Sequence, residues 1–366
     1  MQLRRRQRVT MVGVAVVAMA LSLAACSSSS SPTTTSTSTS SATGTSSASA
    51  QLSGTLNGSG STFQLTFQQA AISAFKSVQP GMTVNYGGGG SGKGRTDLAS
   101  NVVQYAGSDS TIPSSEASSF KSTVLYFPIL IGPITVSYNL SGVTNLKLTP
   151  TVIADIFQGK ITNWNNSAIA SINSGVTLPN QPITVAVRSD SSGTTQNFSL
   201  FLQEAAGSAW TLGSSSIIKW PTSARAGNGN SGVAQIVKST PGAIGYVDYS
   251  TAKATGLTYA SVQNKSGNYV APSTSSATAA ADSATVAPNL TFHAVWATGA
   301  DAYPITYQSW VLVYESQSNS NNAKMLQAYI GYLLGAGQQL LPSLGYAPLP
   351  SSLDSMAKAQ VSKIGS

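Results

Sequence analysis

The chain has 366 residues, and 41% of them are hydrophobic, which is enough for a sizeable core and too much for a disordered protein. Its length predicts about two domains. The net charge is +8, but Arg4, Arg5, Arg6 and Arg8 supply half of it, and the other 15 basic and 11 acidic residues leave only +4. The charge therefore does not indicate a nucleic-acid partner. One cysteine and one histidine exclude a zinc finger, a disulfide framework and a thioredoxin-type motif.

The N-terminus predicts export and a lipid anchor. Basic residues 1–10 precede an apolar run that starts at Met11 and extends over about 15 residues, fewer than the roughly 20 that span a bilayer. The run ends in Leu23-Ala24-Ala25-Cys26, which is similar to a bacterial lipobox. We expect residues 1–25 to be a signal peptide and Cys26 to carry acyl chains that hold the protein at a membrane surface. The alternative is that Cys26 is an ordinary buried core residue.

Two stretches have a low-complexity composition. From Ser27 to Ala50 the chain is almost entirely Ser, Thr and Ala, and it cannot bury enough apolar surface to offset the entropy of ordering it. We therefore expect residues 26–51 to form a flexible tether. The stretch from Ser266 to Asn289 is similarly rich in Ser, Ala and Thr and is predicted to be a surface loop region.

From residue 52 onward, strand-like apolar runs alternate with helical patterns, which indicates an α/β architecture with two lobes. Thr149 before Pro150 predicts a helix start, because threonine caps helices and proline fits their first position. The predicted strands are Val102–Tyr105, Leu125–Ile131, Ile134–Tyr138, Ile183–Val187, Ile244–Val247 and Trp310–Tyr314. The predicted helices are Phe63–Ser77, Pro150–Gln158, Thr194–Ala206, Val233–Lys238 and Ala323–Leu334.

Two glycine-rich loops come first along the chain. In the segment from Gly58 to Phe63, Thr62 can present a hydroxyl beside the free amides of the next helix, or it can be an ordinary helix cap. The segment from Gly87 to Gly94 nearly fits a nucleotide-binding P-loop, but Gly94 stands where Ser or Thr must hold Mg²⁺. We interpret this segment as a backbone cradle for an anion, with Ser91 donating a hydroxyl. A glycine turn without function is the alternative.

An acidic loop and a basic loop follow. Asp109 lies in the loop from Gly107 to Thr111, where it either stabilises a turn or accepts a proton from a ligand. An ionised carboxylate attracts protonated phosphate and repels sulfate, which carries no proton at neutral pH. In the segment from Arg188 to Thr194, the arginine offers a fork of donors that suits an oxyanion, with Asp190 close enough to orient it. A surface Arg–Asp pair followed by an ordinary helix cap is the alternative there.

Together, the four segments resemble the phosphate-binding protein family of bacterial high-affinity phosphate ABC importers, over roughly residues 52–350. The family's Gly-x-Gly-(Ala/Ser)-Thr-Phe, Tyr-x-Gly-x-Gly-Ser and Gly/Ala-Ser-Asp segments stand at Gly58 to Phe63, Tyr86 to Ser91 and Gly107 to Asp109. Its Arg-x-Asp-x-Ser-Gly-Thr segment stands at Arg188 to Thr194. Further similar segments are Phe157 to Trp164, Gly242 to Val247 and Tyr303 to Thr306.

The resemblance implies a role for each matching residue. The phosphate-binding residues would be Thr62, Phe63, Ser91, Asp109, Arg188, Ser192, Gly193 and Thr194, with Asp190 as the partner of Arg188. Thr62 would bind through its hydroxyl, Phe63 through its backbone amide, and Ser91 through both. Asp109 would accept the proton of the ligand.

The resemblance also implies a two-lobed periplasmic binding protein fold, with a hinge of two crossing strands and the ligand in the cleft between the lobes. Lobe I would comprise residues 52–137 and 307–366, and lobe II residues 138–306. The protein would be a monomer, anchored to the outer face of the cytoplasmic membrane, that binds inorganic phosphate and delivers it to the permease subunits of an ABC transporter. It would need no metal, nucleotide or other cofactor.

Three other functions stay open on the sequence. The scaffold could bind another tetrahedral oxyanion, although a sulfate or molybdate receptor should lack the acceptor Asp109. An exported phosphatase or serine hydrolase is the second, because Ser192 lies between a predicted strand and a predicted helix. The only histidine, His293, lies far along the chain in an apolar run, and the sequence has no cluster of metal ligands, so we expect no enzyme. The third is an adhesive lipoprotein, which would not need four donor-rich loops.

Overall fold

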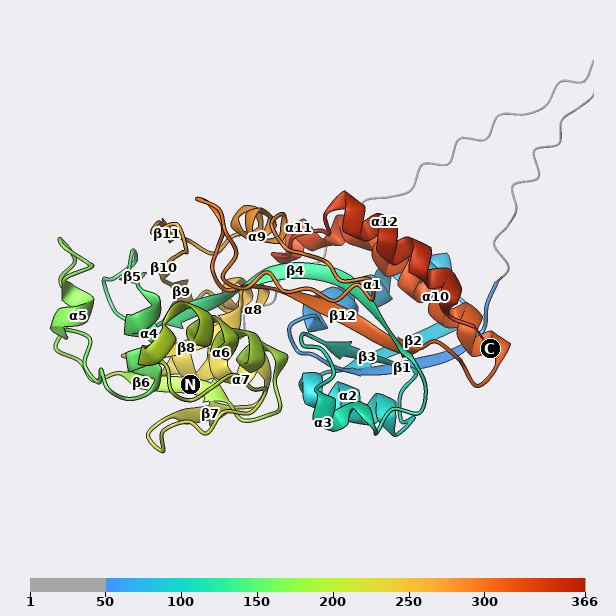
Figure 1. The fold of residues 1–366 in the computed structure, drawn as a ribbon, viewed down its shortest axis with the longest axis horizontal. Helices are drawn as coiled ribbons and strands as arrows, with labels where there is room; N and C mark the ends of the chain where they lie inside the picture. The colour runs from blue at the N-terminus through green and yellow to red at the C-terminus, as the bar shows by residue number, and fades with distance from the viewer. Residues whose placement is uncertain (1–50, 366) are drawn as a thin grey trace, which may run out of the picture. The chain divides into compact units, whose positions relative to one another are not determined.

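The structure is a computed structural model that describes residues 51–365. The predicted signal peptide, the lipidated Cys26 and all but the last residue of the tether lie outside the described residues. The predicted α/β class is confirmed. The larger sheet has nine strands in the order β2-β1-β3-β12-β4-β8-β6-β7, with β9 also paired to β4 (Figure 1). A separate three-stranded sheet has the order β11-β10-β5.

The long strand β4 (Val124–Tyr138) divides the nine-stranded sheet into two halves. Its beginning pairs antiparallel with β12 (Thr306–Tyr314), and its end, from Ile134, pairs antiparallel with β8 (Ala243–Asp248). The first sheet half comprises β1 (Gly54–Gly60), β2 (Met82–Gly87), β3 (Tyr105–Ser108), β12 and the beginning of β4. The second sheet half comprises the end of β4, β6 (Thr184–Arg188), β7 (Arg225–Gly227), β8 and β9 (Thr258–Tyr259).

The chain crosses between the sheet halves along two adjacent segments. It passes from the first half to the second within β4, and it returns along the residues that lead into β12, where the Ile134 amide donates to the Ile305 carbonyl over 2.8 Å. This arrangement agrees with the predicted pair of crossing strands. All residues of β4 except Val124 are buried, which explains why its sequence is a nearly continuous apolar run. The sequence predicted two strands here, but Gly132 and Pro133 do not interrupt the pairing with β12.

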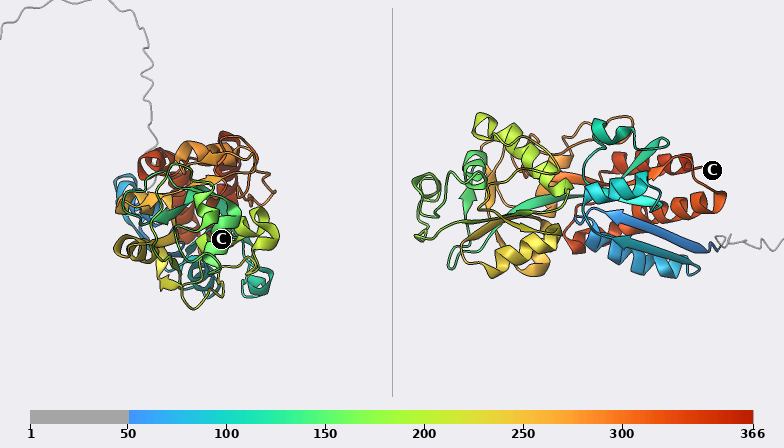
Figure 2. Two further views of the ribbon diagram at one scale, coloured as in Figure 1. Left: turned by 90° about the vertical axis from the view of Figure 1, so that its left-hand side faces the viewer. Right: turned by 90° about the horizontal axis from the view of Figure 1, so that it is seen from below.

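Helices cover both faces of the sheet halves, as the views in Figure 2 show. In the first sheet half, α2 contacts β1 and β3, and α1 contacts β2 and α10. In the second, α7 packs on β6, β7 and β8. The helices are α1 (Leu65–Val78), α2 (Ser91–Ala99), α3 (Ser114–Ala117), α4 (Pro150–Phe157), α5 (Ser167–Ala170), α6 (Gly193–Ala205), α7 (Gly229–Ser239), α8 (Tyr249–Thr255), α9 (Thr274–Ala281), α10 (Ser320–Leu334), α11 (Leu341–Leu344) and α12 (Ser351–Gln360). The remaining elements are β5 (Lys147–Leu148), β10 (Ser261–Gln263), β11 (Tyr269–Val270) and the short 3₁₀ helices Gly207–Ala209, Ala336–Leu340 and Val361–Lys363.

The parallel strands bring the predicted loops together. β1 pairs parallel with β2 and β3, so the carboxyl ends of these three strands lie at one edge of the first sheet half. β6 pairs parallel with β7 and β8, so their carboxyl ends also lie at one edge. In open α/β sheets, ligands bind outside such carboxyl ends. The predicted site residues all follow β1, β2, β3 or β6, or end β6, as Arg188 does.

Local sequence accounts for several helix starts. Thr149 caps α4 as predicted, because its hydroxyl accepts the Val152 amide over 3.2 Å and Pro150 occupies the first helical position. The first predicted helix starts later than expected, at Leu65, because the chain turns before it: the Ser61 amide donates to the Gly107 carbonyl and the Phe63 amide to Ser61 Oγ.

One predicted loop region is wrong. The stretch from Ser266 to Asn289 contains β11 and α9 rather than loop alone. A reciprocal pair of hydrogen bonds between Ser273 and Ser276 caps α9, and the alanines on one face of this helix are buried against β4 and β12. The alanines made this stretch look like a linker in the sequence, but their small side chains let the helix pack closely on the sheet.

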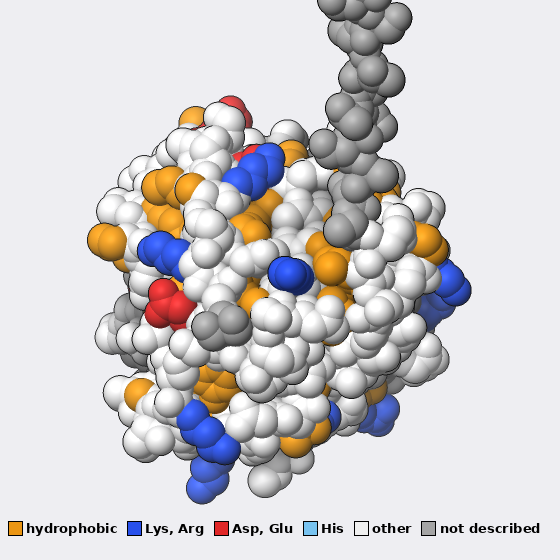
Figure 3. Space-filling view, turned by 90° about the vertical axis from the view of Figure 1, so that its right-hand side faces the viewer, with side chains coloured by type: hydrophobic (Ala, Val, Ile, Leu, Met, Phe, Trp, Pro, Cys, Tyr) orange, Lys and Arg blue, Asp and Glu red, His pale blue; other side chains and the backbone are white. Residues whose placement is uncertain are grey.

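Several lysines on the surface pair with aspartates, namely Lys93 with Asp97, Lys160 with Asp155 and Lys358 with Asp354. On the face shown in Figure 3, Lys and Arg side chains are scattered and do not gather in one patch. Within residues 51–365, no helix combines the length and the apolar character that crossing a bilayer requires.

Candidate functional site: an oxyanion cradle at the carboxyl ends of the strands

Asp109 lies at the centre of the predicted site and is 1% exposed. It follows β3, and its carboxylate accepts hydrogen bonds from three serines. Ser61 Oγ and Ser309 Oγ both donate to Oδ1 over 2.5 Å, and Ser91 Oγ donates to Oδ2 over 3.2 Å. Two short hydrogen bonds therefore occupy Oδ1, while Oδ2 receives one longer hydrogen bond and keeps capacity to accept another proton.

The surroundings of Asp109 determine its protonation. Burial raises the pKa of this carboxyl to about 6, and the hydrogen bonds from Ser309 and Ser61, the charge of Arg188 and the hydrogen bond from Ser91 oppose that rise. Asp109 is therefore mostly ionised at neutral pH and is available as an acceptor. A carboxylate surrounded by hydroxyl donors can hold a ligand that brings its own proton.

A buried chain of polar groups holds Ser309 in position. Ser309 lies at a shift of the β4–β12 register, and such irregularities often reorient a side chain beside a functional site. Gln64 Nε2 donates to Ser309 Oγ over 2.7 Å, and Gln68 and Tyr329 extend the chain behind Gln64. Because Ser309 Oγ accepts from Gln64, its own proton is free to reach Asp109. No sequence motif pointed to Ser309, which is 200 positions from Asp109, whereas Ser61 stands beside Thr62 in a predicted motif.

Ser91 begins α2, inside the glycine-rich segment. Its hydroxyl both accepts the Asp109 amide over 3.1 Å and donates to Asp109 Oδ2. The preceding Gly90 has a φ of +91°, and a side chain there would overlap the Asp190 carboxylate. Lys93, which suggested a P-loop, instead pairs with Asp97 at 2.6 Å on the outer side of α2 and is 54% exposed. The segment is thus a helix start that meets the second sheet half.

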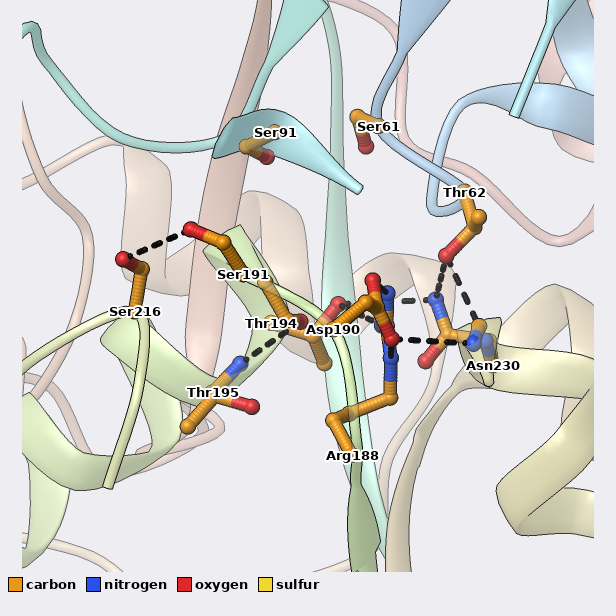
Figure 4. A network of polar contacts seen from close by, with 12 residues as sticks. Ser61, Thr62, Ser91, Arg188, Asp190, Ser191, Thr194, Thr195, Ser216 and Asn230 are labelled. Carbon is orange, nitrogen blue, oxygen red and sulfur yellow. Dashed lines mark hydrogen bonds and ion pairs between the residues drawn. The ribbon is translucent and has the colours of Figure 1, made fainter. Parts of the chain in front are cut away.

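Arg188 and Asp190 form a pair at the end of β6 (Figure 4). Arg188 Nε donates to Asp190 Oδ1 over 2.8 Å, and Nη2 donates to Oδ2 over 2.5 Å. Burial acts to raise the pKa of Asp190, but the hydrogen bonds and charge of Arg188 outweigh it and keep that pKa below its ordinary value. The Arg188 side chain is 1% exposed, so the pair is not the surface pair that the sequence left open. Its remaining donor, Nη1, points to Thr194 Oγ1 at 3.4 Å.

The start of α6 supplies the other predicted donors. Ser192 is the helix cap, and its hydroxyl accepts the Thr195 amide over 3.1 Å, which leaves its proton available as a donor. Gly193 lies close against the first sheet half, because a side chain there would overlap Ser91 Oγ and the Asp109 carboxylate. Thr194 is 1% exposed and turns its hydroxyl toward Arg188.

Hydrogen bonds join the loops of the two sheet halves across the site. The Gly92 amide donates to the Ser191 carbonyl over 3.0 Å, and Asn197 Nδ2 donates to the Asp109 carbonyl over 2.7 Å. Thr62 accepts hydrogen bonds from Asn230, at the start of α7, as Figure 4 shows. All eight predicted ligand residues thus lie on the loops that these contacts connect; their bonds to a ligand stay a prediction.

Phe63 has a different environment from the one predicted. Its amide, expected to bind the ligand, donates to Ser61 Oγ over 3.1 Å in this structure. Its ring is 1% exposed and stacks on Tyr307, with ring centroids 4.0 Å apart. The ring therefore forms an apolar wall behind the polar groups.

A cavity of about 730 Å³ adjoins the cradle at Asp109. Residues from both sheet halves line it, among them Glu116, Asn197, Gln308 and the exposed His293. Of the predicted ligand residues, only Asp109 is in its lining. Ser192 Oγ accepts the Thr195 amide and is not in this lining, whereas His293 is.

Comparisons with known proteins identify the family. Residues 45–336 match the family described as the PBP superfamily domain. The chain is 34% identical over 323 residues to phosphate-binding protein PstS 3 of Mycobacterium tuberculosis, which covers 85% of this chain and 86% of that protein. It is 33% identical over 312 residues to phosphate-binding protein PstS of Pasteurella multocida, covering 84% and 89%.

Solved structures show the same fold. A high-affinity periplasmic phosphate-binding protein solved with phosphate has a TM-score of 0.70 at 21% identity, covering 84% of this chain and 94% of that one. The phosphate-binding protein from Stenotrophomonas maltophilia also has a TM-score of 0.70, at 19% identity, covering 84% and 93%. From the match to the superfamily and the identity to its curated relatives, we conclude that this chain belongs to the phosphate-binding protein family of the PBP superfamily.

Proposed function

We propose that this protein binds inorganic phosphate outside the cytoplasmic membrane and delivers it to an ABC-type phosphate permease. The observation that carries the proposal is that a buried acidic acceptor and buried cationic and neutral donors face the same site. A buried carboxylate acceptor, Asp109, lies across the site from a buried guanidinium, Arg188, and from the start of α6. The relatives named for phosphate binding support the same ligand.

The arrangement selects a ligand that is both an anion and a proton donor. Arg188, the hydroxyls of Thr62 and Thr194, and the amides at the start of α6 would donate to phosphate oxygens. Ser91 could donate its hydroxyl proton to phosphate only by giving up its 3.2 Å hydrogen bond to Asp109 Oδ2. Asp109 Oδ2 would accept the proton of the ligand. Sulfate at neutral pH would place an unprotonated oxygen against this carboxylate, and that repulsion is the basis for rejecting it.

Asp190 keeps Arg188 in place and offsets its charge before the ligand arrives. Because the guanidinium uses Nε and Nη2 on Asp190, its Nη1 edge is oriented toward Thr194 and the site. A positioned donor needs little reorganisation when the anion enters, which favours tight binding.

The arrangement of the chain suggests how phosphate is enclosed. We take lobe I to be residues 52–137 and 307–366 and lobe II to be residues 138–306. The two lobes would close on the ligand by bending at β4 and at the segment leading into β12. The lipidated Cys26 and a tether over residues 26–51 would keep a monomer near its permease. In this account the protein is a carrier and not an enzyme, and it requires no metal or cofactor.

Isothermal titration of the purified full chain, freed of bound phosphate, tests the proposal. We expect one-to-one binding of phosphate and no measurable heat with sulfate at pH 8. Incubation with p-nitrophenyl phosphate is the control for the phosphatase alternative, and we expect no release of nitrophenol. A folded, phosphate-free protein that gives no heat with phosphate would contradict the proposal.

A further inference from the structure

Asn230 connects the two sides of the proposed phosphate site. It is the second residue of α7, follows the loop at the carboxyl end of β7, and is 1% exposed. Figure 4 shows it facing Thr62, which follows β1 in the first sheet half. No motif in the sequence predicted a role for this loop, although Gly227-Asn228 leads into α7 much as the glycine-rich segment leads into α2 at Ser91.

Two N–H groups of Asn230 converge on one hydroxyl oxygen. The backbone N–H donates to Thr62 Oγ1 over 3.3 Å, and Nδ2 donates to the same atom over 3.2 Å. A threonine hydroxyl has one proton to donate and two lone pairs to accept with. Because both lone pairs of Thr62 Oγ1 are used, this hydroxyl is left to act as a donor.

The same Nδ2 acts on a second hydroxyl, which belongs to the second sheet half. It donates to Thr194 Oγ1 over 3.4 Å, and Arg188 Nη1 donates to that oxygen over the same distance. Thr194 is therefore also left with its proton to donate. Tyr307 OH, 3.4 Å away, is its one hydroxyl neighbour among the described hydrogen bonds, and a phosphate oxygen is a stronger acceptor than a phenol.

Packing alone does not explain an asparagine at this position. Among residues 51–365, Asn230 Oδ1 is one of few buried side-chain atoms that have no hydrogen-bond partner. A buried acceptor without a partner destabilises the folded state. The contribution of this side chain thus lies in its Nδ2 group, which reaches one hydroxyl on each side of the site.

We propose that Asn230 is a positioning residue for phosphate. It fixes the hydroxyls of Thr62 and Thr194 as donors toward the unprotonated oxygens of the ligand, and it links the two sheet halves around them. Asn230 and Asp109 then have complementary effects. Asn230 determines where the site donates hydrogen bonds, and Asp109 determines where it accepts one. This inference rests on the proposed function and adds to it the residue that sets the direction of the hydroxyl hydrogen bonds.

Titration with inorganic phosphate at pH 7.5 tests the inference on the full chain. Asn230→Asp keeps the shape but replaces the Nδ2 donor by an oxygen, so Thr62 and Thr194 would donate to the new carboxylate instead of the ligand. We expect a loss of affinity of at least 100-fold for this variant and of about 10-fold for Asn230→Ala. The matched control is Asn228→Ala, two positions earlier, where the side chain is exposed, and we expect affinity within twofold of the wild type.

A double-mutant cycle separates positioning from a structural role. If Asn230 acts through the Thr62 hydroxyl, the loss caused by Asn230→Ala should fall from about tenfold to about threefold or less in a Thr62→Val background. A purely structural role predicts the same loss in both backgrounds, and that result would overturn the inference. Thermal unfolding without phosphate shows whether each variant is folded.

The outcomes distinguish this inference from the proposed function. A wild-type protein that binds no phosphate would refute the proposed function itself. A wild type that binds phosphate, together with an Asn230→Ala variant of equal affinity, would refute only the role of Asn230. If Asn230→Ala does not fold, Asn230→Asp decides, and affinity within twofold of the wild type would then refute the inference.

Discussion

Asp109 and Asp190 are two aspartates on opposite sides of the same site, and their surroundings shift their pKa values in opposite directions. Asp109 has neutral partners, the hydroxyls of Ser61, Ser91 and Ser309, and burial raises its pKa to about 6. Asp190 has a guanidinium partner, and its pKa is lowered despite burial. One carboxylate is thus kept close to protonation, and the other is kept charged.

This difference shows how one residue type can perform two tasks in one site. A carboxylate near its pKa can share a proton with a ligand, whereas a carboxylate bound to arginine serves to orient and offset that charge. Substitutions and changes of pH can separate these two tasks, and replacing Arg188 should have the largest effect.

Arg188→Met should have the largest effect. It removes the positive charge and leaves Asp190 as an unpaired carboxylate beside the anion, so we expect phosphate affinity to fall by at least about 1,000-fold. The free energy of unfolding should also fall, by about 2 kcal/mol or more, because a buried charge loses its partner. Titration and denaturant unfolding measure the two effects.

The double variant Arg188→Met/Asp190→Asn provides the control for this prediction. Removing the unpaired carboxylate should restore much of the stability but none of the phosphate binding. Restored binding would show that Arg188 serves only to neutralise Asp190, contrary to the role given to it here.

Asp109→Asn should change which anion is bound. The amide can donate a proton where the carboxylate only accepts, so we expect phosphate affinity to fall by about 100-fold and sulfate affinity to rise by about 100-fold. Competition titrations at pH 8 measure both. Asp190→Asn is the comparison variant, and it should weaken both anions without favouring sulfate.

The stability of the phosphate-free protein should increase as pH falls from 8 to 5. Burial raises the pKa of Asp109 and of Asp248, a second fully buried carboxyl, from 3.8 to about 6. Between these values the folded state binds protons that the unfolded state does not, so this stabilisation is complete below about pH 4 and lost above about pH 6. Each carboxyl should contribute about 1 kcal/mol between pH 7 and pH 5.

The contribution of Asp190 to stability depends on pH in the opposite direction and changes at lower pH. Its lowered pKa gives stability that is present above its unfolded pKa and is lost as pH falls through its folded pKa, so it adds little slope between pH 5 and 8. Urea unfolding at each pH checks the prediction, and Asp109→Asn should remove about half of the slope. A stability that does not change from pH 8 to 5 would contradict it.

Ser309→Ala should have the smallest effect. It removes one of the two hydrogen bonds to Asp109 Oδ1, so the pKa of Asp109 should rise further and phosphate affinity should fall by a few fold. Carboxyl ¹³C chemical shifts followed against pH report the change. An unchanged pKa would show that Ser309 does not help to stabilise the ionised carboxylate.

Local patterns predicted much of the fold and the site. Thr149-Pro150 marked the start of α4, and the apolar run beginning at Leu125 marked the first part of β4. The motifs around Asp109 and Arg188 identified both charged groups, because each motif keeps its chemistry within a few residues.

Contacts between distant segments could not be predicted in the same way. Ser309 reaches Asp109 only through the register of β12 against β3, and Asn230 reaches Thr62 only because two separate loops meet. Composition was misleading for α9, since buried alanines and a serine cap look like a linker in the sequence. The role of Ser192 as a helix cap also depends on where α6 starts, which its motif alone leaves open.

The most direct test measures the affinity of the wild-type protein for sulfate as a function of pH. It tests whether Asp109 selects its ligand by accepting a proton from it. If sulfate binds only when Asp109 is protonated, its affinity should be level below about pH 6 and should fall about tenfold for each pH unit above it. Phosphate affinity should change much less over the same range, because phosphate brings its own proton. A sulfate affinity that is the same at pH 5 and pH 8 would contradict the account.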